Sequence, residues 1–324
     1  MYTYQIDAAA LFKDRTDQFA KFGIALDDIE RIRAAVTGMW ADAPGGWVYE
    51  WSKVANEYAD GGEHRTASLI YGCAKFPCLT DEARVTAMQH QLEQFELAAK
   101  DFPVDFERRV VAVPYRNGSV EVPVHLYSAD GDYAARPVLI ATGGVDTGET
   151  AIPLDEHADE VIRGLAAYAR TLGNGRVAHF GASFGGNFSA MSGLAGIVDA
   201  AIDLGGPVVD SFDREHVKNL PFGMHDILGN AMHCDHSPTL DELSAGLGQL
   251  NRQNLLAQQQ NSAMLVVNGA DDYFIPQSDT LIFRGRPNTE VHLIEGTGHV
   301  AMSKAPEVVP KIIAWLRAHF VENC

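Results

Sequence analysis

The sequence predicts an α/β fold with a mostly parallel sheet, and three observations point to it. Short apolar runs recur after about residue 104, and each ends in a turn that carries glycine or aspartate. Stretches with helical periodicity separate these runs, which is the alternation typical of a parallel sheet. Residues 1–103, in contrast, show no convincing strand pattern. We therefore expect a helical N-terminal cap at 1–103 and an α/β core at 104–324.

The N-terminal block is expected to be helical throughout. Apolar residues at helical spacing predict four helices, and Thr80 or Asp81 is placed to cap the last of them. Trp40, Trp47 and Trp51 fall close together in this block. Such tryptophans either pack inside a domain or face a ligand, and the sequence leaves both interpretations open. The predicted helices are Leu26–Val36, Val48–Ala59, His64–Lys75 and Asp81–Lys100.

The core is expected to open with an antiparallel hairpin. Two β-rich runs, Phe106–Tyr115 and Val120–Tyr127, are joined by Asn117-Gly118, a strong signal for a two-residue turn. Residues 209 to about 260 lack strand alternation, so we expect a helical lid insertion there. The predicted buried strands are Pro137–Ala141, Val177–Phe180, Ala200–Leu204, Met264–Asn268 and Val291–Ile294, and Val308–Val321 is expected to be a closing helix.

A serine turn between a strand and a helix is the centre of the expected site. Gly181-Ala-Ser-Phe-Gly185 follows an apolar run and precedes a helical segment. Ser183 would occupy a strained turn, so its neighbours two places away must lack bulk, and glycine meets that need on both sides. The alternative interpretation is a glycine-rich turn with an incidental serine.

Candidate partners for this serine follow later in the chain. Asp271 and Asp272 come just after one expected strand, and His299 lies on a glycine-bearing loop after the last one. We prefer Asp272 as the acid because Pro276 stands four residues beyond it, a spacing that recurs in the fold this chain resembles. The order Ser, Asp, His is similar to that of the α/β-hydrolase fold and differs from the orders in chymotrypsin and subtilisin.

Backbone donors for a developing oxyanion are expected at two places. Phe184 follows the serine at the start of a helix, where N–H groups lack intrahelical partners. Gly143 and Gly144 follow the strand that ends near Ala141 and let the backbone turn its N–H groups inward. Gly144 or Val145 should therefore supply the second donor. A plain glycine turn is the alternative interpretation.

Composition and charge narrow the expected partners to a small-molecule substrate. The chain has 324 residues and a formal net charge of −18, which disfavours nucleic acid and anionic membrane surfaces. No run of about eighteen apolar residues and no pattern typical of a cleaved signal is present, so we expect a cytoplasmic protein. The cysteines are too sparse for a disulfide framework and are expected to be reduced thiols. They are Cys73, Cys78, Cys234 and Cys324.

No cofactor and no metal ion are expected. No Walker loop or glycine-rich nucleotide turn stands between a strand and a helix. One cluster in the lid insertion contains metal-ligating residue types, but its spacing matches no tight ligand pattern, so we interpret it as a polar loop. The cluster comprises His225, Asp226, His233, Cys234, Asp235 and His236.

Together these motifs resemble the FrsA-like branch of the α/β-hydrolases, which includes relatives of 2,6-dihydroxypseudooxynicotine hydrolase and of fungal pigment chain-shortening hydrolases. The resemblance covers most of the chain: the helical N-terminal segment, the turn at 143–147, the serine turn, and the loops of Asp272 and His299. It implies an esterase, or a hydrolase that cleaves a C–C bond beside a ketone. It also implies that the helical segment caps the site, often at a dimer contact, so a homodimer is the expected assembly.

The chain departs from this pattern at one point. The family resemblance implies a further strand and helix between the glycine turn and the serine turn, but only about forty residues separate Gly143 from Ser183. One strand–helix unit of roughly thirty residues is missing between Thr147 and Gly148. Either the protein has lost this unit or the printed sequence omits it. We favour an omission, because a lost central strand would leave backbone groups to be hydrogen-bonded elsewhere.

The predicted reaction is acyl transfer to water. Ser183 attacks a carbonyl, His299 moves the proton, and Asp272 orients His299. The same residues would serve an ester, a ketone whose C–C bond is cleaved, or an acyltransferase or cyclase in which a substrate hydroxyl replaces water. A non-catalytic binding or regulatory protein is the alternative of another class. An apolar cap favours a bulky aromatic or polyketide-like substrate. The expected substrate contacts are Asp146, Trp40, Trp47, Trp51, Phe76 and Phe222.

Overall fold

The computed structural model describes residues 1–145, 152–221 and 223–321. The chain divides into two compact units. A helical unit contains residues 1–106 and 221–238, and a sheet unit contains 107–220 and 239–324. Of the region 209–260, where we expected a lid insertion, only 221–238 belongs to the helical unit, and the remainder belongs to the sheet unit.

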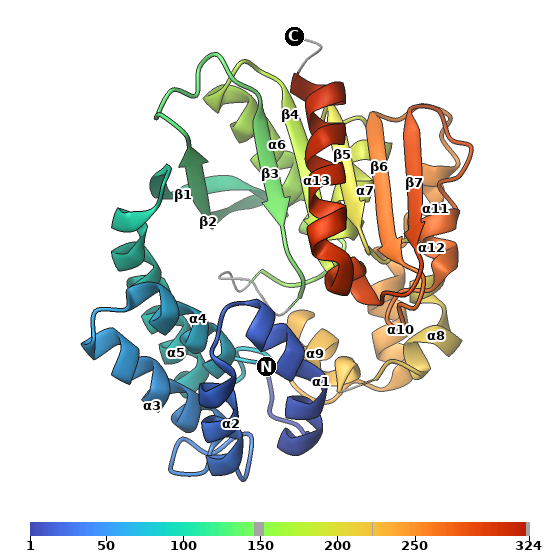
Figure 1. Ribbon diagram of the computed structural model, residues 1–324. Helices are drawn as coiled ribbons and strands as arrows, with labels where there is room; N and C mark the ends of the chain where they lie inside the picture. The colour runs from blue at the N-terminus through green and yellow to red at the C-terminus, as the bar shows by residue number, and fades with distance from the viewer. Residues whose placement is uncertain (146–151, 222, 322–324) are drawn as a thin grey trace. The chain divides into compact units, whose positions relative to one another are not determined.

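The helical unit agrees with the sequence except at its start. Four helices lie within a few residues of the predicted ranges, and the Asp81 carboxylate caps the last by accepting the Arg84 N–H. The helix α1 was not predicted, because only Leu11, Phe12 and Phe19 of its residues are buried apolar side chains. The elements are α1 (Ala8–Lys21), α2 (Leu26–Ala35), α3 (Trp47–Asp60), α4 (His64–Ala74), α5 (Glu82–Ala98), the 3-10 turn η1 (Ala99–Asp101) and α9 (Met224–Ala231) (Figure 1).

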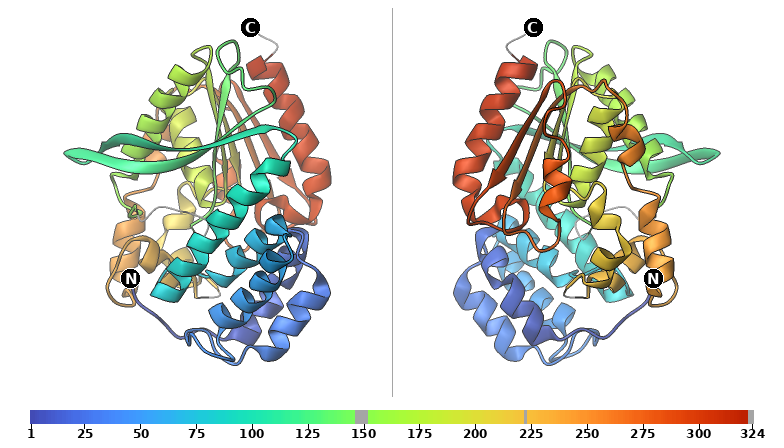
Figure 2. Two further views of the ribbon diagram at one scale, coloured as in Figure 1. Left: turned by 90° about the vertical axis from the view of Figure 1, so that its left-hand side faces the viewer. Right: turned by 90° about the vertical axis from the view of Figure 1, so that its right-hand side faces the viewer.

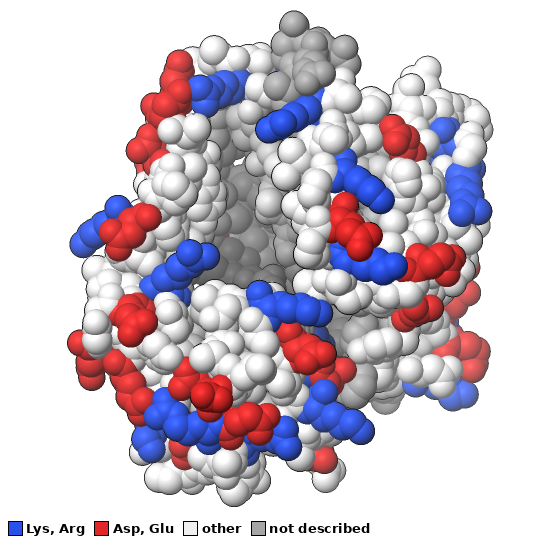
Figure 3. Space-filling view, in the orientation of Figure 1, with Lys and Arg blue, Asp and Glu red and all other residues white. Residues whose placement is uncertain are grey.

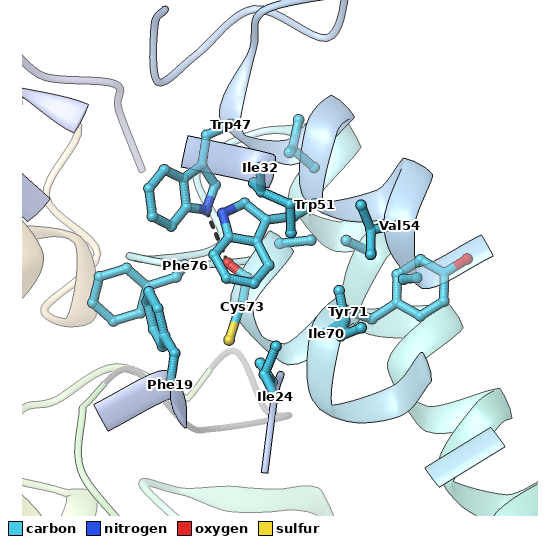
Figure 4. Packing of buried hydrophobic residues seen from close by; sticks show 14 of the residues in the cluster. Phe19, Ile24, Ile32, Trp47, Trp51, Val54, Ile70, Tyr71, Cys73 and Phe76 are labelled. Carbon is cyan, nitrogen blue, oxygen red and sulfur yellow. Dashed lines mark hydrogen bonds between the residues drawn. The ribbon is translucent and has the colours of Figure 1, made fainter. Parts of the chain in front are cut away.

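Trp47 and Trp51 form the centre of the helical unit's core. Both side chains are 0% exposed. The Phe12 ring centroid lies 4.7 Å from that of Trp47 and 6.0 Å from that of Trp51. The Trp47 indole N–H donates a hydrogen bond of 2.9 Å to the Cys73 carbonyl, drawn as a dashed line in Figure 4. All these contacts lie inside one unit, so they favour the packing interpretation of the two tryptophans.

The sheet unit contains the predicted parallel sheet and hairpin. Five strands pair in the order β3-β4-β5-β6-β7, all parallel, and β1 and β2 form a separate two-stranded antiparallel hairpin. The strands are β1 (Asp105–Tyr115), β2 (Gly118–Ser128), β3 (Val138–Thr142), β4 (Val177–Ala182), β5 (Ala200–Leu204), β6 (Ala263–Gly269) and β7 (Thr289–Ile294).

Helices cover both faces of the parallel sheet. Ile202 and Leu265 pack in one apolar cluster with Ile312 of α13, whereas their neighbours Ala201 and Met264 pack on the opposite face with residues of α6 and α7. Figures 1 and 2 show the same layering. The helices are α6 (Ala158–Leu172), α7 (Phe184–Leu194), α8 (Arg214–Lys218), α10 (Leu240–Gly248), α11 (Gln253–Leu256), α12 (Gln277–Leu281) and α13 (Ala305–Leu316), with the short turns η2 (Asp210–Phe212), η3 (His299–Lys304) and η4 (Arg317–Val321).

The strand β3 forms one edge of the parallel sheet. The hairpin projects to the side (Figure 2), and among the described residues no strand pairs with the outer edge of β3. Leu139 of this strand is 47% exposed. The position of the missing unit, between Thr147 and Gly148, lies outside the described residues. Loss of a central strand would leave a gap in the sheet, but the five described strands pair without a gap. An additional strand after Thr147 would therefore find an open place beside β3.

None of the described helices combines the length and the apolar content that crossing a bilayer requires.

Candidate active site

Ser183 lies in the sharp turn between β4 and α7. Its backbone has φ 56° and ψ −129°, a conformation that costs a non-glycine residue about 1–3 kcal/mol. The turn is also crowded. A β-carbon on Gly181 would lie 2.0 Å from the Gly185 carbonyl oxygen, and one on Gly185 would lie 2.4 Å from the Thr142 oxygen. Both positions therefore require glycine, for the reason the sequence suggested.

Three side chains that are distant in the sequence meet at this turn. The His299 Nε2 atom lies 2.9 Å from the Ser183 Oγ atom, and His299 Nδ1 lies 2.7 Å from Asp272 Oδ2. Although Ser183 is the N-cap residue of α7, its side chain makes no capping hydrogen bond, so the hydroxyl can face His299. The Asp272 side chain is fully buried, and that of His299 is 23% exposed.

Asp272, and not its neighbour Asp271, faces the histidine. The N–H groups of Phe274 and Ile275 donate to Asp272 Oδ1 at 2.8 Å and 3.2 Å. The Asn268 amide donates to Oδ2 at 2.9 Å. Asp271 is exposed at the protein surface. The donors around Asp272 hold its carboxylate in one orientation, with one oxygen turned to His299.

The turn that follows β3 lies against the serine turn. Thr142 pairs with Gly181 in the sheet, and the Gly143 carbonyl oxygen would be 2.7 Å from a β-carbon on Gly185. Gly144 and Val145 come directly after this contact, and Phe184 begins α7. These placements fit the predicted oxyanion donors, whose role stays a prediction.

Two buried ionisable residues under the serine turn were missed by the sequence analysis. His179 of β4 lies between Thr142 Oγ1 and Ser192 Oγ, at 2.9 Å from each. Burial lowers the pKa of His179 to about 4, so the ring is neutral at pH 7. Asp203 of β5 accepts the Gly206 N–H at 2.7 Å, and burial raises the pKa of Asp203 to about 7. A polar residue inside an apolar strand was the only signal for either one.

The predicted substrate contacts lie in three kinds of place. Asp146 and Phe222 lie outside the described residues. Trp47 and Trp51 are buried, as is Phe76, so packing accounts for them. Trp40 is partly buried in the helical unit, with the Arg84 guanidinium carbon 4.4 Å from its ring centroid. A role for any of them in substrate binding stays a prediction.

The polar cluster of the lid insertion makes hydrogen bonds within the helical unit. Asp226 accepts from the Tyr2 hydroxyl at 3.0 Å and from the Ser237 hydroxyl at 2.6 Å. His236 Nδ1 lies 2.6 Å from its neighbour Asp235. Within residues 1–145, 152–221 and 223–321, no group of three or more His, Cys, Asp or Glu side chains is arranged to hold a metal ion.

Surface charges of both signs are interspersed. On the face drawn in Figure 3, acidic and basic side chains lie next to one another. In the helical unit, Arg31 pairs with Asp28 and Glu57, and Arg33 pairs with Glu30. Carboxylates therefore neutralise these arginines locally, in a chain whose net charge is −18.

The positions of the three residues on the sheet define the class of protein. The serine follows β4, the acid follows β6 and the histidine follows β7, each at the carboxyl end of a parallel strand. The chain thus has the α/β-hydrolase fold.

Solved structures share this fold over nearly the whole chain. A structure of wild-type AbyA5 is similar with a TM-score of 0.80 and 17% identity, covering 97% of this chain and 95% of that one. A structure of 2,6-dihydroxy-pseudo-oxynicotine hydrolase is similar with a TM-score of 0.74 and 18% identity, covering 94% and 95%. Both agree with the predicted resemblance to the FrsA-like branch. No protein-family model and no curated protein sequence matches the chain.

Proposed function

We propose that this chain is a serine hydrolase that acts on an ester or ketone carbonyl through Ser183, His299 and Asp272. The observation that carries the proposal is the continuous contact from Ser183 Oγ through the His299 ring to Asp272, at 2.9 Å and 2.7 Å. One protein of similar structure is 2,6-dihydroxy-pseudo-oxynicotine hydrolase, and this supports hydrolysis as the reaction class.

The first half of the proposed reaction forms an acyl-enzyme. The Ser183 oxygen attacks the carbonyl carbon while His299 Nε2 takes the hydroxyl proton. The Nδ1–H of His299 donates to Asp272 Oδ2, which stabilises the imidazolium that forms. The N–H groups of Phe184 and of Val145 or Gly144 would hold the oxyanion. Collapse of the tetrahedral intermediate then expels the leaving group, which takes the proton from His299.

The second half releases the acyl group. Water donates a proton to His299 Nε2 as it attacks the acyl carbon, and the proton then returns to the Ser183 oxygen. In C–C bond cleavage the expelled group is a stabilised carbanion instead of an alkoxide. In an acyltransferase or cyclase a substrate hydroxyl replaces water. Product analysis separates these versions: an acid with an alcohol indicates an ester, and an acid with a ketone indicates C–C cleavage.

A fluorophosphonate tests the proposal directly, because it reacts with an activated serine. The intact mass of the treated protein should show one adduct on the wild type and none on the Ser183→Ala variant. A folded wild-type protein that gains no adduct, or a variant that is labelled equally, would contradict the proposal. The first result would favour a non-catalytic binding or regulatory protein on this scaffold.

The proposed substrate is bulky and aromatic or polyketide-like. This part rests on the family resemblance, since the aromatic residues that first suggested it are buried or partly buried in the helical unit, or lie outside the described residues. Aryl esters with large acyl groups should be turned over faster than acetyl esters of the same alcohol. Equal kcat/KM values for the two series would refute the size preference and leave the proposed chemistry intact.

A further inference from the structure

Asn268 connects the segment that carries Asp272 (the acid loop) with the segment that carries His299 and Val300 (the histidine loop). It lies near the end of β6 and is 0% exposed. Its Nδ2 group donates to Asp272 Oδ2 at 2.9 Å, and the same oxygen lies 2.7 Å from His299 Nδ1. The other carboxylate oxygen is occupied by the N–H groups of Phe274 and Ile275. Asn268 and His299 therefore share one oxygen atom of the acid.

The orientation of the Asn268 amide follows from its surroundings. Its Oδ1 atom accepts the N–H groups of Gly269, at 2.8 Å, and of Val300, at 3.1 Å. Both of these partners are donors only, so the oxygen must face them and the NH₂ group must face the carboxylate. The side chain thus donates to the Asp272 carboxylate through its nitrogen and accepts from the Val300 N–H of the histidine loop through its oxygen.

The histidine loop is strained where Asn268 holds it. Val300 and Ala301, directly after His299, have φ values of 51° and 50°. A β-branched residue rarely adopts this left-handed conformation, which costs about 1–3 kcal/mol and needs support from its surroundings. The Val300 N–H receives that support from Asn268 Oδ1, and the Ala301 N–H from the Gly298 carbonyl.

The space around Asn268 leaves its side chain little freedom. Gly205, at the end of β5, has φ 68°, and a β-carbon there would lie 2.9 Å from Asn268 Oδ1 and 3.0 Å from Val300 Cγ1. The ends of two strands and the histidine loop are therefore packed against one another. A side chain held in this way transmits its position to both groups that it contacts.

We propose that Asn268 is a positioning residue that sets the distance and angle between Asp272 and His299. It touches no reacting atom, and its effect passes through the acid and the histidine loop. The inference rests on the proposed serine hydrolase function. It predicts that the reactivity of Ser183 depends on the Asn268 NH₂ group and on the Asn268 oxygen separately.

Two substitutions separate the contributions of the two atoms. Asn268→Asp keeps an oxygen for the Val300 N–H but turns a second carboxylate oxygen toward Asp272. Two carboxylates at this distance hold one proton between them at low pH and repel each other once it is lost. Asn268→Ala removes both contacts and adds no charge. Asn174→Asp, at an exposed position, is the matched control.

The test measures the second-order rate of fluorophosphonate labelling between pH 6 and pH 9, relative to wild type at each pH. We expect Asn268→Ala to label at least about 10- to 100-fold more slowly at every pH, because loss of the hydrogen bond to the charged Asp272 carboxylate is alone worth that much. The labelling rate of Asn268→Asp, relative to wild type, should fall little at pH 6 and about 100-fold at pH 9. Asn174→Asp should match the wild type throughout.

The outcomes distinguish this inference from the proposed function. If the wild type labels and Asn268→Asp follows it within twofold across the pH range, the positioning role is refuted and the serine hydrolase stands. A loss for Asn268→Asp that does not change with pH also refutes the inference, because general destabilisation would produce it. If the wild type does not label, the proposed function fails first. Should Asn268→Ala not fold, the pH dependence of Asn268→Asp still decides.

Discussion

His299 and Ser183 are 116 positions apart in the chain, yet their Nε2 and Oγ atoms lie 2.9 Å apart. The parallel sheet produces this contact, because the carboxyl ends of its strands lie at one edge. The serine follows β4 and the histidine follows β7, with β5 and β6 between them. Loops from both strands meet above that edge. The sheet order therefore determines the contact, and the two loops set its distance.

Asp272→Asn should remove most of the activity, whereas Asp271→Asn should change it little. The amide at position 272 would favour the wrong tautomer of His299 and would not stabilise its cation. We expect kcat to fall by about 10³- to 10⁴-fold. Asp271 is exposed, so its variant should stay within about threefold of wild type. The measurement is kcat on an aryl ester that the wild type turns over. Loss of activity in Asp271→Asn alone would show that the acid is assigned wrongly.

The sequence predicted the elements whose signals are local. The strands β4, β5 and β6 are mostly apolar runs, because helices cover both faces of the sheet, and the turns of Ser183 and Asp272 carry glycine or aspartate next to two of them. The hairpin was predicted from two β-rich runs and the Asn117-Gly118 turn that joins them. The helix α1 was not predicted, since it buries few apolar residues and its packing partners lie elsewhere in the helical unit.

The parts of the site that depend on tertiary contacts were beyond the sequence. Asn268 and His179 each appear as one polar residue in an apolar strand, and the sequence does not show what their side chains meet. The sequence also left open whether Trp47 packs inside the domain or faces a ligand. Its burial among Phe12 and Phe19 depends on how the helices pack. Loss of a strand was expected to leave a gap within the sheet, but β3 lies at the edge of the described sheet instead. The order of strands in a sheet cannot be read from the sequences of the strands.

Acidification should destabilise this protein partly through His179. The pKa of the buried ring is lowered to about 4, whereas an unfolded histidine titrates near 6.5. The unfolded state therefore binds the extra proton first, and the stability contribution is present above pH 6.5 and lost as the pH falls toward 4. This effect amounts to about 2 kcal/mol between pH 7 and pH 5.

The variant His179→Gln isolates that contribution. Gln keeps one donor and one acceptor for Ser192 and Thr142 but does not titrate. Its free energy of unfolding, measured by urea denaturation at pH 7 and pH 5, should fall less than that of wild type. The exposed His90→Gln serves as the control. If the free energy of unfolding falls equally in His179→Gln and wild type between pH 7 and pH 5, His179 does not cause the destabilisation by acid.

Leu139→Lys should reduce self-association of the protein. The outer edge of β3 carries no charge over Val138–Thr142, and uncharged open edges pair readily with other strands. A lysine at the exposed position 139 should discourage such pairing at little cost to folding. Light scattering across a concentration series would measure it. An unchanged oligomer distribution in a folded Leu139→Lys variant would show that this edge does not mediate association.

The intact mass of the wild-type protein tests whether the natural chain contains a further strand–helix unit beside the edge of β3. A chain with the printed sequence has a mass of 35.2 kDa. An excess of about 3 kDa, the size of one strand–helix unit, would mean that the natural chain carries a further strand for β3. A matching mass would mean that the protein has lost this unit and keeps the edge open.

Asp203→Asn should stabilise the protein at alkaline pH. Burial raises the pKa of Asp203 to about 7, far above the usual value near 4, so the folded state retains a proton that the unfolded state has lost. The stability contribution of this group is complete below pH 4 and disappears as the pH rises through 7. An asparagine oxygen can still accept the Gly206 N–H, and the amide carries no charge to desolvate.

We expect the Asp203→Asn variant to gain on the order of 2 kcal/mol in free energy of unfolding over wild type at pH 8, relative to their difference at pH 5. Urea denaturation at both pH values measures the gain, with the exposed Asp132→Asn as the control. If Asp203→Asn is less stable than wild type at pH 8, the charged carboxylate must have a favourable partner that offsets its burial.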